Sequence, residues 1–219
     1  MTLTRARLAA VIFDCDGTLV DSEPLARVAW ERSLAPHGYE IDDDEYAGLI
    51  GLPYPRVHGF FADRVPGLAA PDAFWEGYSG RLFELIDTQL AVFEDALETV
   101  RGLAAHGLAV AVASSSPRPR LDRTLARAGL ADAFAVTVAG DEILHGKPAP
   151  DMFLAAAERL GVEPARCAAI EDSAPGVAAG LAAGMTTVGI ARSSAGTAAL
   201  GDAHVVLKRL SAEAVLAAA

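Results

Sequence analysis

The stretch FDCDGTLVDS, residues 13–22, ends an apolar run that begins at Leu8. The run has the length and composition of a strand buried on both faces. Asp14 and Asp16 follow at positions i and i+2, so both carboxylates are expected on one side of the strand's carboxyl end, where ligands bind in open α/β sheets. An EF-hand loop is an alternative, but its glycine comes later after the first aspartate than Gly17 does here.

Apolar runs of strand length alternate with helical patterns along most of the chain. This alternation is typical of a parallel sheet covered by helices, a Rossmann-like α/β fold. The predicted strands are Leu8–Phe13, Leu108–Ala113, Phe134–Val138, Cys167–Ile170, Thr186–Ile190 and Ala203–Val206. The predicted helices between them are Arg118–Ala128, Asp151–Leu160 and Gly176–Ala183.

Residues 21–90 interrupt this alternation. They show helical spacing of aromatic and aliphatic residues, Gly- and Pro-rich turns such as GLPYP at 51–55, and no convincing strand. We therefore predict a small all-helical domain, residues 21–90, inserted into a catalytic core made of residues 1–20 and 91–219. His58 in this insert and His145 in the core are expected to be surface residues.

A second acidic group, Glu171-Asp172, directly follows the strand predicted to end at Ile170. Carboxylates gathered at neighbouring strand ends would repel one another by several kcal/mol per close pair, even at an effective dielectric constant of about 20. A cation is needed to hold them together. An oxygen-only ligand set, with no His or Cys group beside it, indicates Mg²⁺ rather than zinc.

Hydroxyl groups and a lysine complete the set of polar side chains after strands. Ser114 and Ser115 follow the strand that ends at Ala113, and hydroxyls and backbone N–H groups ahead of a helix suit a phosphate. Lys147 lies in the turn GKPAPD, residues 146–151, which is not a P-loop because proline stands at the required Ser/Thr position. Acids, a metal, hydroxyls and a lysine after different strands predict a phosphoryl-transfer site with a carboxylate nucleophile.

The composition of the chain disfavours some classes of binding partner. The 219-residue chain has a formal net charge of −11 and no basic run, which disfavours nucleic acid and anionic membranes. The uncharged stretch Ser173–Ala191 is long enough for a membrane span, but its Ala/Gly content and strand-like end favour a helix packed on a sheet. Two cysteines without a CxxC pattern suit the cytoplasm. We expect a cytoplasmic protein that acts as a monomer on a small phosphorylated metabolite.

The DxDGTLVDS run, the strand-end serine, the GKPxPD lysine and the EDS motif occur in the order found in the haloacid dehalogenase superfamily. The chain resembles its phosphatase branch with a helical cap. The resemblance implies that Asp14 is the nucleophile and Asp16 the general acid/base, and that Ser114 and Lys147 hold phosphate. It also implies a Mg²⁺ site made of these groups: Asp14, the carbonyl of Asp16, Asp172, and Glu171 close by or through water.

Within this family the chain looks most like the sugar-phosphate phosphatases and β-phosphoglucomutase. The mutase carries a histidine four residues beyond the Ser/Thr that matches Ser22, and here that position is Ala26. We therefore expect hydrolysis of a hexose, deoxyhexose or polyol phosphate, with a phosphomutase as the alternative. A non-catalytic phosphorylatable receiver module is a further alternative, but receivers are shorter and lack an inserted cap.

Two features of the resemblance concern the insert and its return to the core. The family's cap loop implies that the segment containing Gly51 and Arg56 contacts the substrate, although a solvated surface arginine explains Arg56 equally well. Where the family has a proline-glycine turn, this chain has Phe93-Glu94-Asp95-Ala96. That departure leaves the local hinge geometry open.

Overall fold

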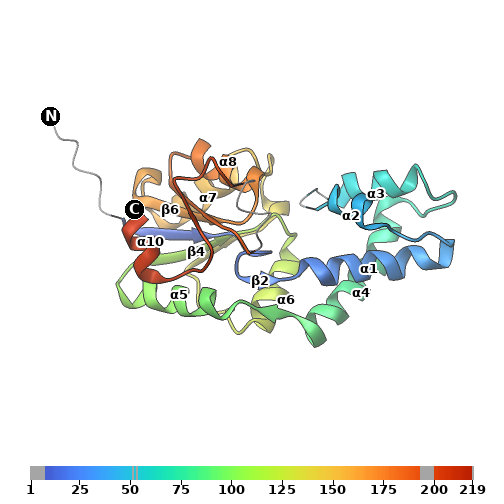
Figure 1. Cartoon of the computed structure of the whole chain (residues 1–219), viewed down its shortest axis with the longest axis horizontal. Coiled ribbons are helices and arrows are strands. Elements are labelled where there is room, and N and C mark those ends of the chain that lie inside the picture. Colours follow the sequence, from blue (N-terminus) through green and yellow to red (C-terminus); the bar gives the residue numbers. More distant parts are fainter. Residues whose placement is uncertain (1–7, 51, 53, 193–199, 219) are drawn as a thin grey trace. The chain divides into compact units, whose positions relative to one another are not determined.

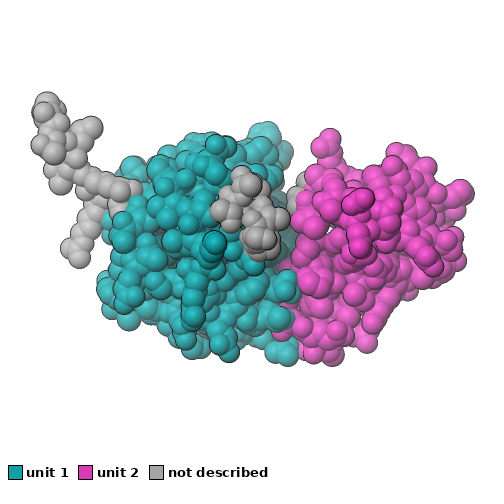
Figure 2. Space-filling model, viewed as in Figure 1, with its two compact units in different colours: residues 1–21, 91–219 teal, residues 22–90 magenta. Residues whose placement is uncertain are grey.

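The computed structural model describes residues 8–50, 52, 54–192 and 200–218. The chain forms two compact units, drawn in different colours in Figure 2. Unit 1 combines Met1–Asp21 with Ala91–Ala219, and unit 2 is Ser22–Leu90. Unit 2 is therefore an insertion between two segments that fold together.

Unit 1 is built on a six-stranded, all-parallel sheet with the strand order β5-β4-β1-β6-β7-β8. Its strands are β1 (Ala10–Phe13), β4 (Ala109–Ala113), β5 (Val136–Val138), β6 (Cys167–Glu171), β7 (Thr186–Ile190) and β8 (Val205–Leu207). All six predicted strands are confirmed, with ends that differ by at most two residues. Every residue of β1 and β6 is buried, as expected for strands covered on both faces.

Helices cover the two faces of this sheet (Figure 1). They are α5 (Glu94–Ala105), α6 (Arg118–Arg127), α7 (Asp151–Leu160), α8 (Ala174–Ala182) and α10 (Ala212–Ala218), with short 3₁₀ turns at Gly140–Glu142 and Pro164–Arg166. Helices α7 and α8 lie on one face, where Met152 and Phe153 pack against Ile12 and Ala111, and α5 and α6 lie on the other. This two-sided cover is the Rossmann-like arrangement that the sequence predicts.

The Ala/Gly-rich segment that resembled a membrane span forms α8 and β7. A Cβ at Gly180 would lie 2.8 Å from Thr187 Oγ1 and 2.9 Å from Ala169 Cβ, so only a glycine lets α8 approach the sheet this closely. Within the described residues, no helix combines the length and the hydropathy that crossing a membrane requires.

A second, two-stranded antiparallel sheet lies in unit 1, where the chain leaves for unit 2 and returns. It pairs β2 (Val20–Asp21) with β3 (Ala91–Val92). The loop between β1 and β2 is a tight turn, in which Gly17 N–H donates to Val20 O at 2.7 Å. Gly17 has a φ of +84°, a left-handed conformation that glycine adopts without steric cost.

Within the described residues of unit 2, every element of regular secondary structure is a helix. Its elements are α1 (Glu23–Leu34), a 3₁₀ turn at Ala35–His37, α2 (Asp43–Ala47), α3 (Tyr54–Ala62) and α4 (Pro71–Gln89), with α1 packed along α4. Trp30 lies at its centre, with its ring centroid 4.4 Å from that of Tyr78 and 5.1 Å from that of Phe61. Aromatic packing of this kind provides the unit's core.

The two histidine predictions have different outcomes. His145 is exposed, as predicted. The prediction for His58 was wrong, because its ring is buried within the aromatic core of unit 2 and its Nε2 lies 2.9 Å from the carbonyl oxygen of Ala69. A buried imidazole is tolerated when its nitrogen has a hydrogen-bond partner. Here that partner is a backbone carbonyl eleven residues away, which the residues next to His58 in the sequence do not reveal.

Candidate active site

Asp14 lies at the carboxyl end of β1, the strand between β4 and β6. Its backbone N–H donates to Ile170 O at 2.9 Å, which continues the β1–β6 pairing to the last residue before the turn. Ser114 follows β4 and Glu171 ends β6, so three of the predicted site residues lie at neighbouring strand ends. Connections on either side of β1 run in opposite directions along the sheet, and ligands bind at such a switch point.

Lys147 joins two of the carboxylates. Its Nζ lies 2.5 Å from Asp14 Oδ1 and 2.6 Å from Glu171 Oε1, and it donates to Ala113 O at 3.0 Å. Its side chain is only 6% exposed. Burial by itself would lower the pKa of Lys147, but the two carboxylates outweigh burial and raise the pKa. The ammonium group therefore stays charged in the site.

Asp14, Glu171 and Asp172 each place a carboxylate oxygen within 4.8 Å of the others. Burial raises the pKa of Asp14 well above its usual range, and the charges of Glu171 and Asp172 add to this, while Lys147 opposes it. Burial and the charge of Glu171 raise the pKa of Asp172 to about 7. The single positive charge of Lys147 does not neutralise these three carboxyl groups. A hard divalent cation bound by oxygen atoms fits both the charge and the donor set.

Glu171 is held by the N-terminal end of α8. Its Oε2 accepts hydrogen bonds from the backbone N–H groups of Asp172 at 3.1 Å and Ser173 at 3.2 Å, and from Ser173 Oγ at 2.9 Å. A Cβ at Gly176 would overlap the Glu171 carboxylate, so the helix can lie against this group only with glycine there. These contacts fix Oε2 and leave Oε1 directed at Lys147.

Asp16 does not join the carboxylate cluster with its side chain. Ser116 Oγ donates to Asp16 Oδ2 at 2.8 Å, and Arg120 Nη2 donates to Oδ1 at 2.9 Å. Ser114 Oγ lies 3.4 Å from the same Oδ2. Both oxygens of Asp16 are thus bound by residues at the start of α6 and in the turn before it.

Ser116 and Arg120 were not among the predicted site residues. A weak signal for Ser116 was present in the serine run at 114–116, and Arg120 follows Ser116 by four positions, one helical turn. Of the two predicted serines, Ser114 is buried and accepts from Ser116 N–H at 3.1 Å, whereas Ser115 is exposed. The structure therefore brings Asp14, Lys147, Glu171 and Asp172 together, with Asp16 and Ser114 beside one another.

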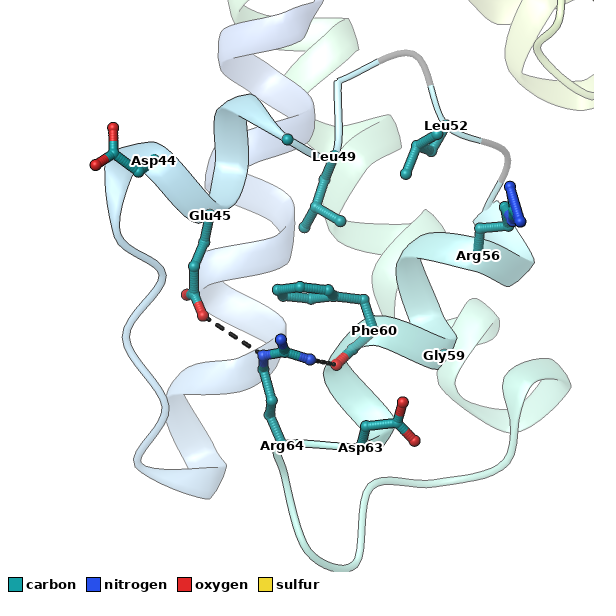
Figure 3. A pocket seen from close by; sticks show the side chains of 10 residues that line it. Asp44, Glu45, Leu49, Leu52, Arg56, Gly59, Phe60, Asp63 and Arg64 are labelled. Atoms are coloured by element: carbon teal, nitrogen blue, oxygen red, sulfur yellow. Dashed lines mark hydrogen bonds and ion pairs between the residues drawn. The ribbon is translucent and has the colours of Figure 1, made fainter.

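The two predicted residues of the insert have different standings. Gly51 lies outside the described residues. Arg56 is exposed on α3 and, within the described residues, forms no ion pair. It lines a hollow of about 600 Å³ in unit 2, shown in Figure 3. In that hollow Arg64 lies 3.6 Å from Glu45 Oε1 and stacks over the ring of Phe60.

Comparison with known proteins adds the family context. The sequence matches the haloacid dehalogenase-like hydrolase family over residues 8–184. It is 34% identical to fructose-1-phosphate phosphatase YqaB of Escherichia coli K12 over 84% of this chain and 97% of that one. It is 31% identical to hexitol phosphatase B of the same organism over 84% of each chain. The crystal structure of a putative β-phosphoglucomutase from Thermotoga maritima superposes with a TM-score of 0.77 and 27% identity, covering 96% of this chain and 97% of that one.

Proposed function

The chain belongs to the haloacid dehalogenase-like hydrolases and is a phosphoric monoester hydrolase, and we propose that it is a magnesium-dependent phosphatase of a small sugar or polyol phosphate that forms a phosphorylated Asp14. The observation that carries the proposal is the buried cluster in which Lys147 bridges Asp14 and Glu171, with Asp172 alongside. Such a cluster combines a nucleophile, a fixed cation and a cation-binding set within one site.

In the first step a carboxylate oxygen of Asp14 attacks the substrate's phosphorus atom. The bond between phosphorus and the leaving-group oxygen breaks, and that oxygen takes a proton from the carboxylic acid form of Asp16. Lys147 and Ser114 hold the phosphoryl oxygens, and the charge of Lys147 stabilises the negative charge that they share in the transition state. The products are the dephosphorylated alcohol and a phosphorylated Asp14.

In the second step water attacks the phosphorus atom of phosphorylated Asp14. Asp16, now a carboxylate, accepts a proton from the water, and the bond between phosphorus and the Asp14 oxygen breaks to release inorganic phosphate. Asp16 thus serves first as acid and then as base, as one group can in a two-step displacement. Asp14, Asp172 and the Asp16 carbonyl would hold Mg²⁺, with Glu171 behind them, and the ion would neutralise charge on the phosphoryl oxygens.

The substrate class follows from two lines of support. The relatives named above are phosphatases of fructose 1-phosphate and of hexitol phosphates. Unit 2, which we assign as the cap, has the exposed Arg56 beside its hollow, where a guanidinium can bind a second anionic or hydroxyl group of a substrate. We assign Arg56 and Gly51 to substrate recognition.

A phosphomutase is the second candidate, because the similar Thermotoga structure carries the name of one. The residue at the position of the mutase histidine is Ala26, a buried methyl group in α1 that cannot relay a proton. Water is therefore expected to complete the second step. Formation of glucose 6-phosphate from β-glucose 1-phosphate without release of phosphate would favour the mutase instead.

The direct test uses p-nitrophenyl phosphate and a panel of phosphorylated sugars and polyols, with phosphate release as the readout. Asp14→Asn and chelation of divalent cations are each expected to abolish turnover, and Mg²⁺ is expected to restore the chelated enzyme. Asp132→Asn, which changes an exposed acid, serves as the matched control and should leave turnover intact. Turnover by Asp14→Asn at the rate of that control would rule out the covalent route.

A further inference from the structure

A largely buried ion pair between Asp95 and Arg192 holds four separate segments of unit 1 together. Arg192 Nη1 lies 2.8 Å from both carboxylate oxygens of Asp95. Arg192 Nη2 donates to the carbonyl oxygen of Thr18 at 2.8 Å, and the Leu210 N–H donates to Asp95 Oδ2 at 2.8 Å. The side chains are only 10% and 19% exposed for Asp95 and Arg192, respectively. We call this set of contacts the Arg192 clamp.

The clamp stands where this chain departs from its family's pattern. Asp95 belongs to Phe93-Glu94-Asp95-Ala96, the segment in place of the expected proline-glycine turn. The guanidinium carbon of Arg192 lies 3.9 Å from the centroid of the Phe93 ring, so the arginine packs on this segment as well as pairing with it. The segment that replaces the proline-glycine turn thus supplies one partner of a charged, largely buried contact.

The loop gripped by the clamp carries Asp16. Backbone hydrogen bonds close this loop on itself: the N–H groups of Leu19 and Val20 both donate to Cys15 O, at 2.9 and 3.2 Å. These bonds place Thr18, which Arg192 contacts, and Asp16, which Ser116 and Arg120 contact, in one closed turn, so a contact at Thr18 restrains the backbone that carries Asp16. Phe93 N–H also donates to Leu19 O at 3.1 Å, which joins the same loop to the start of α5.

We propose that Arg192 is a positioning residue for the acid/base step: through the Thr18 carbonyl it holds the loop that carries Asp16, the proposed proton donor, and Asp95 holds Arg192. This inference rests on the proposed function, because it concerns the delivery of a proton by Asp16. Arg192 touches neither the reacting phosphoryl group nor the carboxylate cluster. Its effect is specific, since a displaced Asp16 impairs reactions that need a protonated leaving group.

The test compares two substrates that differ in leaving group. p-Nitrophenolate leaves readily without a proton, whereas the phenolate of phenyl phosphate is a poorer leaving group and gains more from protonation. The value of kcat/KM reports steps up to loss of the leaving group, so it is insensitive to hydrolysis of the phosphorylated aspartate. Asp16→Asn calibrates the assay and should lower kcat/KM for phenyl phosphate by a larger factor than for p-nitrophenyl phosphate.

Three variants separate the contacts of the clamp. Arg192→Met removes both contacts, and Arg192→Lys keeps a positive charge near Asp95 but lacks a second nitrogen for Thr18. Both are expected to lower kcat/KM for phenyl phosphate about tenfold more than for p-nitrophenyl phosphate, in the direction of Asp16→Asn. Asp95→Asn leaves the contact between Arg192 and Thr18 in place and should show a smaller difference between substrates. The lysine variant carries the test if Arg192→Met does not fold.

Arg159→Met is the matched control. Arg159 also bonds a carboxylate, Glu142, at 2.7 Å and a backbone carbonyl, Thr137, at 3.2 Å, but on α7 and away from the Asp16 loop. It should reduce both activities equally or not at all. Equal factors for the two substrates in Arg192→Lys, with Asp16→Asn still selective, would overturn the inference and leave the proposed function standing. A non-selective Asp16→Asn would instead contradict the proposed role of Asp16.

Discussion

Asp172 occupies the space that a side chain at position 17 would need. A Cβ built on Gly17 would overlap Asp172 Oδ2, and the φ of Gly17, +84°, lies in the left-handed region that disfavours every residue with a Cβ. The turn after β1 and the residue after β6 therefore interlock. The DxDG and ED motifs, which are far apart in the sequence, depend on one another through this contact.

Replacing Gly17 tests that dependence. Backbone strain in Gly17→Ala is expected to lower the free energy of unfolding by about 1–3 kcal/mol. Because Asp172 must also move, phosphatase activity is expected to fall by about a hundredfold or more relative to the wild type. Gly129→Ala is the control, since Gly129 has a similar φ of +69° but nothing within 4 Å of its Cβ position. Urea denaturation and phosphate release measure the two effects. Equal activity in the two variants would contradict the interlock.

Asp172→Asn should stabilise the cation-free protein and weaken its stabilisation by Mg²⁺. Without a bound cation, Asp172 adds a negative charge to a buried cluster that already contains Asp14 and Glu171. The variant is therefore expected to raise the melting temperature of the chelated protein at pH 8 by a few degrees. It should also reduce or abolish the rise that Mg²⁺ produces in the wild type, which follows from preferential binding to the folded state. A lower melting temperature in the chelated variant would contradict the idea that these acids repel.

Lys147→Met should have the opposite effect on stability. It leaves Asp14 and Glu171 buried without their shared cation, and breaking a buried ion pair in this way costs about 3–5 kcal/mol. Saturating Mg²⁺ is expected to recover part of that loss, because the ion supplies positive charge to the same cluster. Denaturation with and without Mg²⁺ measures the recovery. An identical loss under both conditions would place the cation away from this cluster.

The Asp95–Arg192 pair is expected to stabilise the protein less at acidic pH than at neutral pH. Burial by itself would raise the pKa of Asp95, but hydrogen bonds from Arg192 and the Leu210 N–H outweigh it, and the pKa is lowered. The unfolded chain then binds a proton more readily than the folded one, so the pair's contribution is present above about pH 4 and is lost as pH falls through the lower folded value. Wild type should lose more stability than Asp95→Asn between about pH 5 and pH 3 in urea denaturation. Parallel losses would contradict the lowered pKa.

Much of the core fold could be predicted because its signals are local. Strands β1 and β4, and β6 as far as Ile170, are continuous apolar runs between turns, as strands covered on both faces require. The two-residue strands β2 and β3 were not predicted, since two residues carry no periodicity. Helix α5 was not predicted either, although its buried residues Ala96, Val100 and Leu103 recur at helical spacing.

The residues of the candidate site likewise fall into those that local sequence identified and those that it did not. Asp14, Lys147, Glu171 and Asp172 were named from the sequence because each directly follows a strand or lies in a constrained turn. Ser116 and Arg120 were missed, and the contact from Arg120 to Asp16 spans 104 positions in the sequence. A residue in the exposed part of an amphipathic helix looks the same in sequence whether it contacts solvent or an active-site acid. The histidine at position 58 shows the same limit in the core of unit 2.

The sequence by itself determined the order of strands and helices and the kinds of group that collect at the strand ends, because apolar period and motif spacing are properties of neighbouring residues. Tertiary structure alone decided which oxygen faces which cation: that Glu171 turns one oxygen to Lys147 and the other to α8, that Asp16 turns to α6, and that Arg192 reaches Thr18. Those choices depend on pairing between segments up to 174 positions apart. Burial makes each such pairing energetically decisive, and burial exists only once the chain has folded.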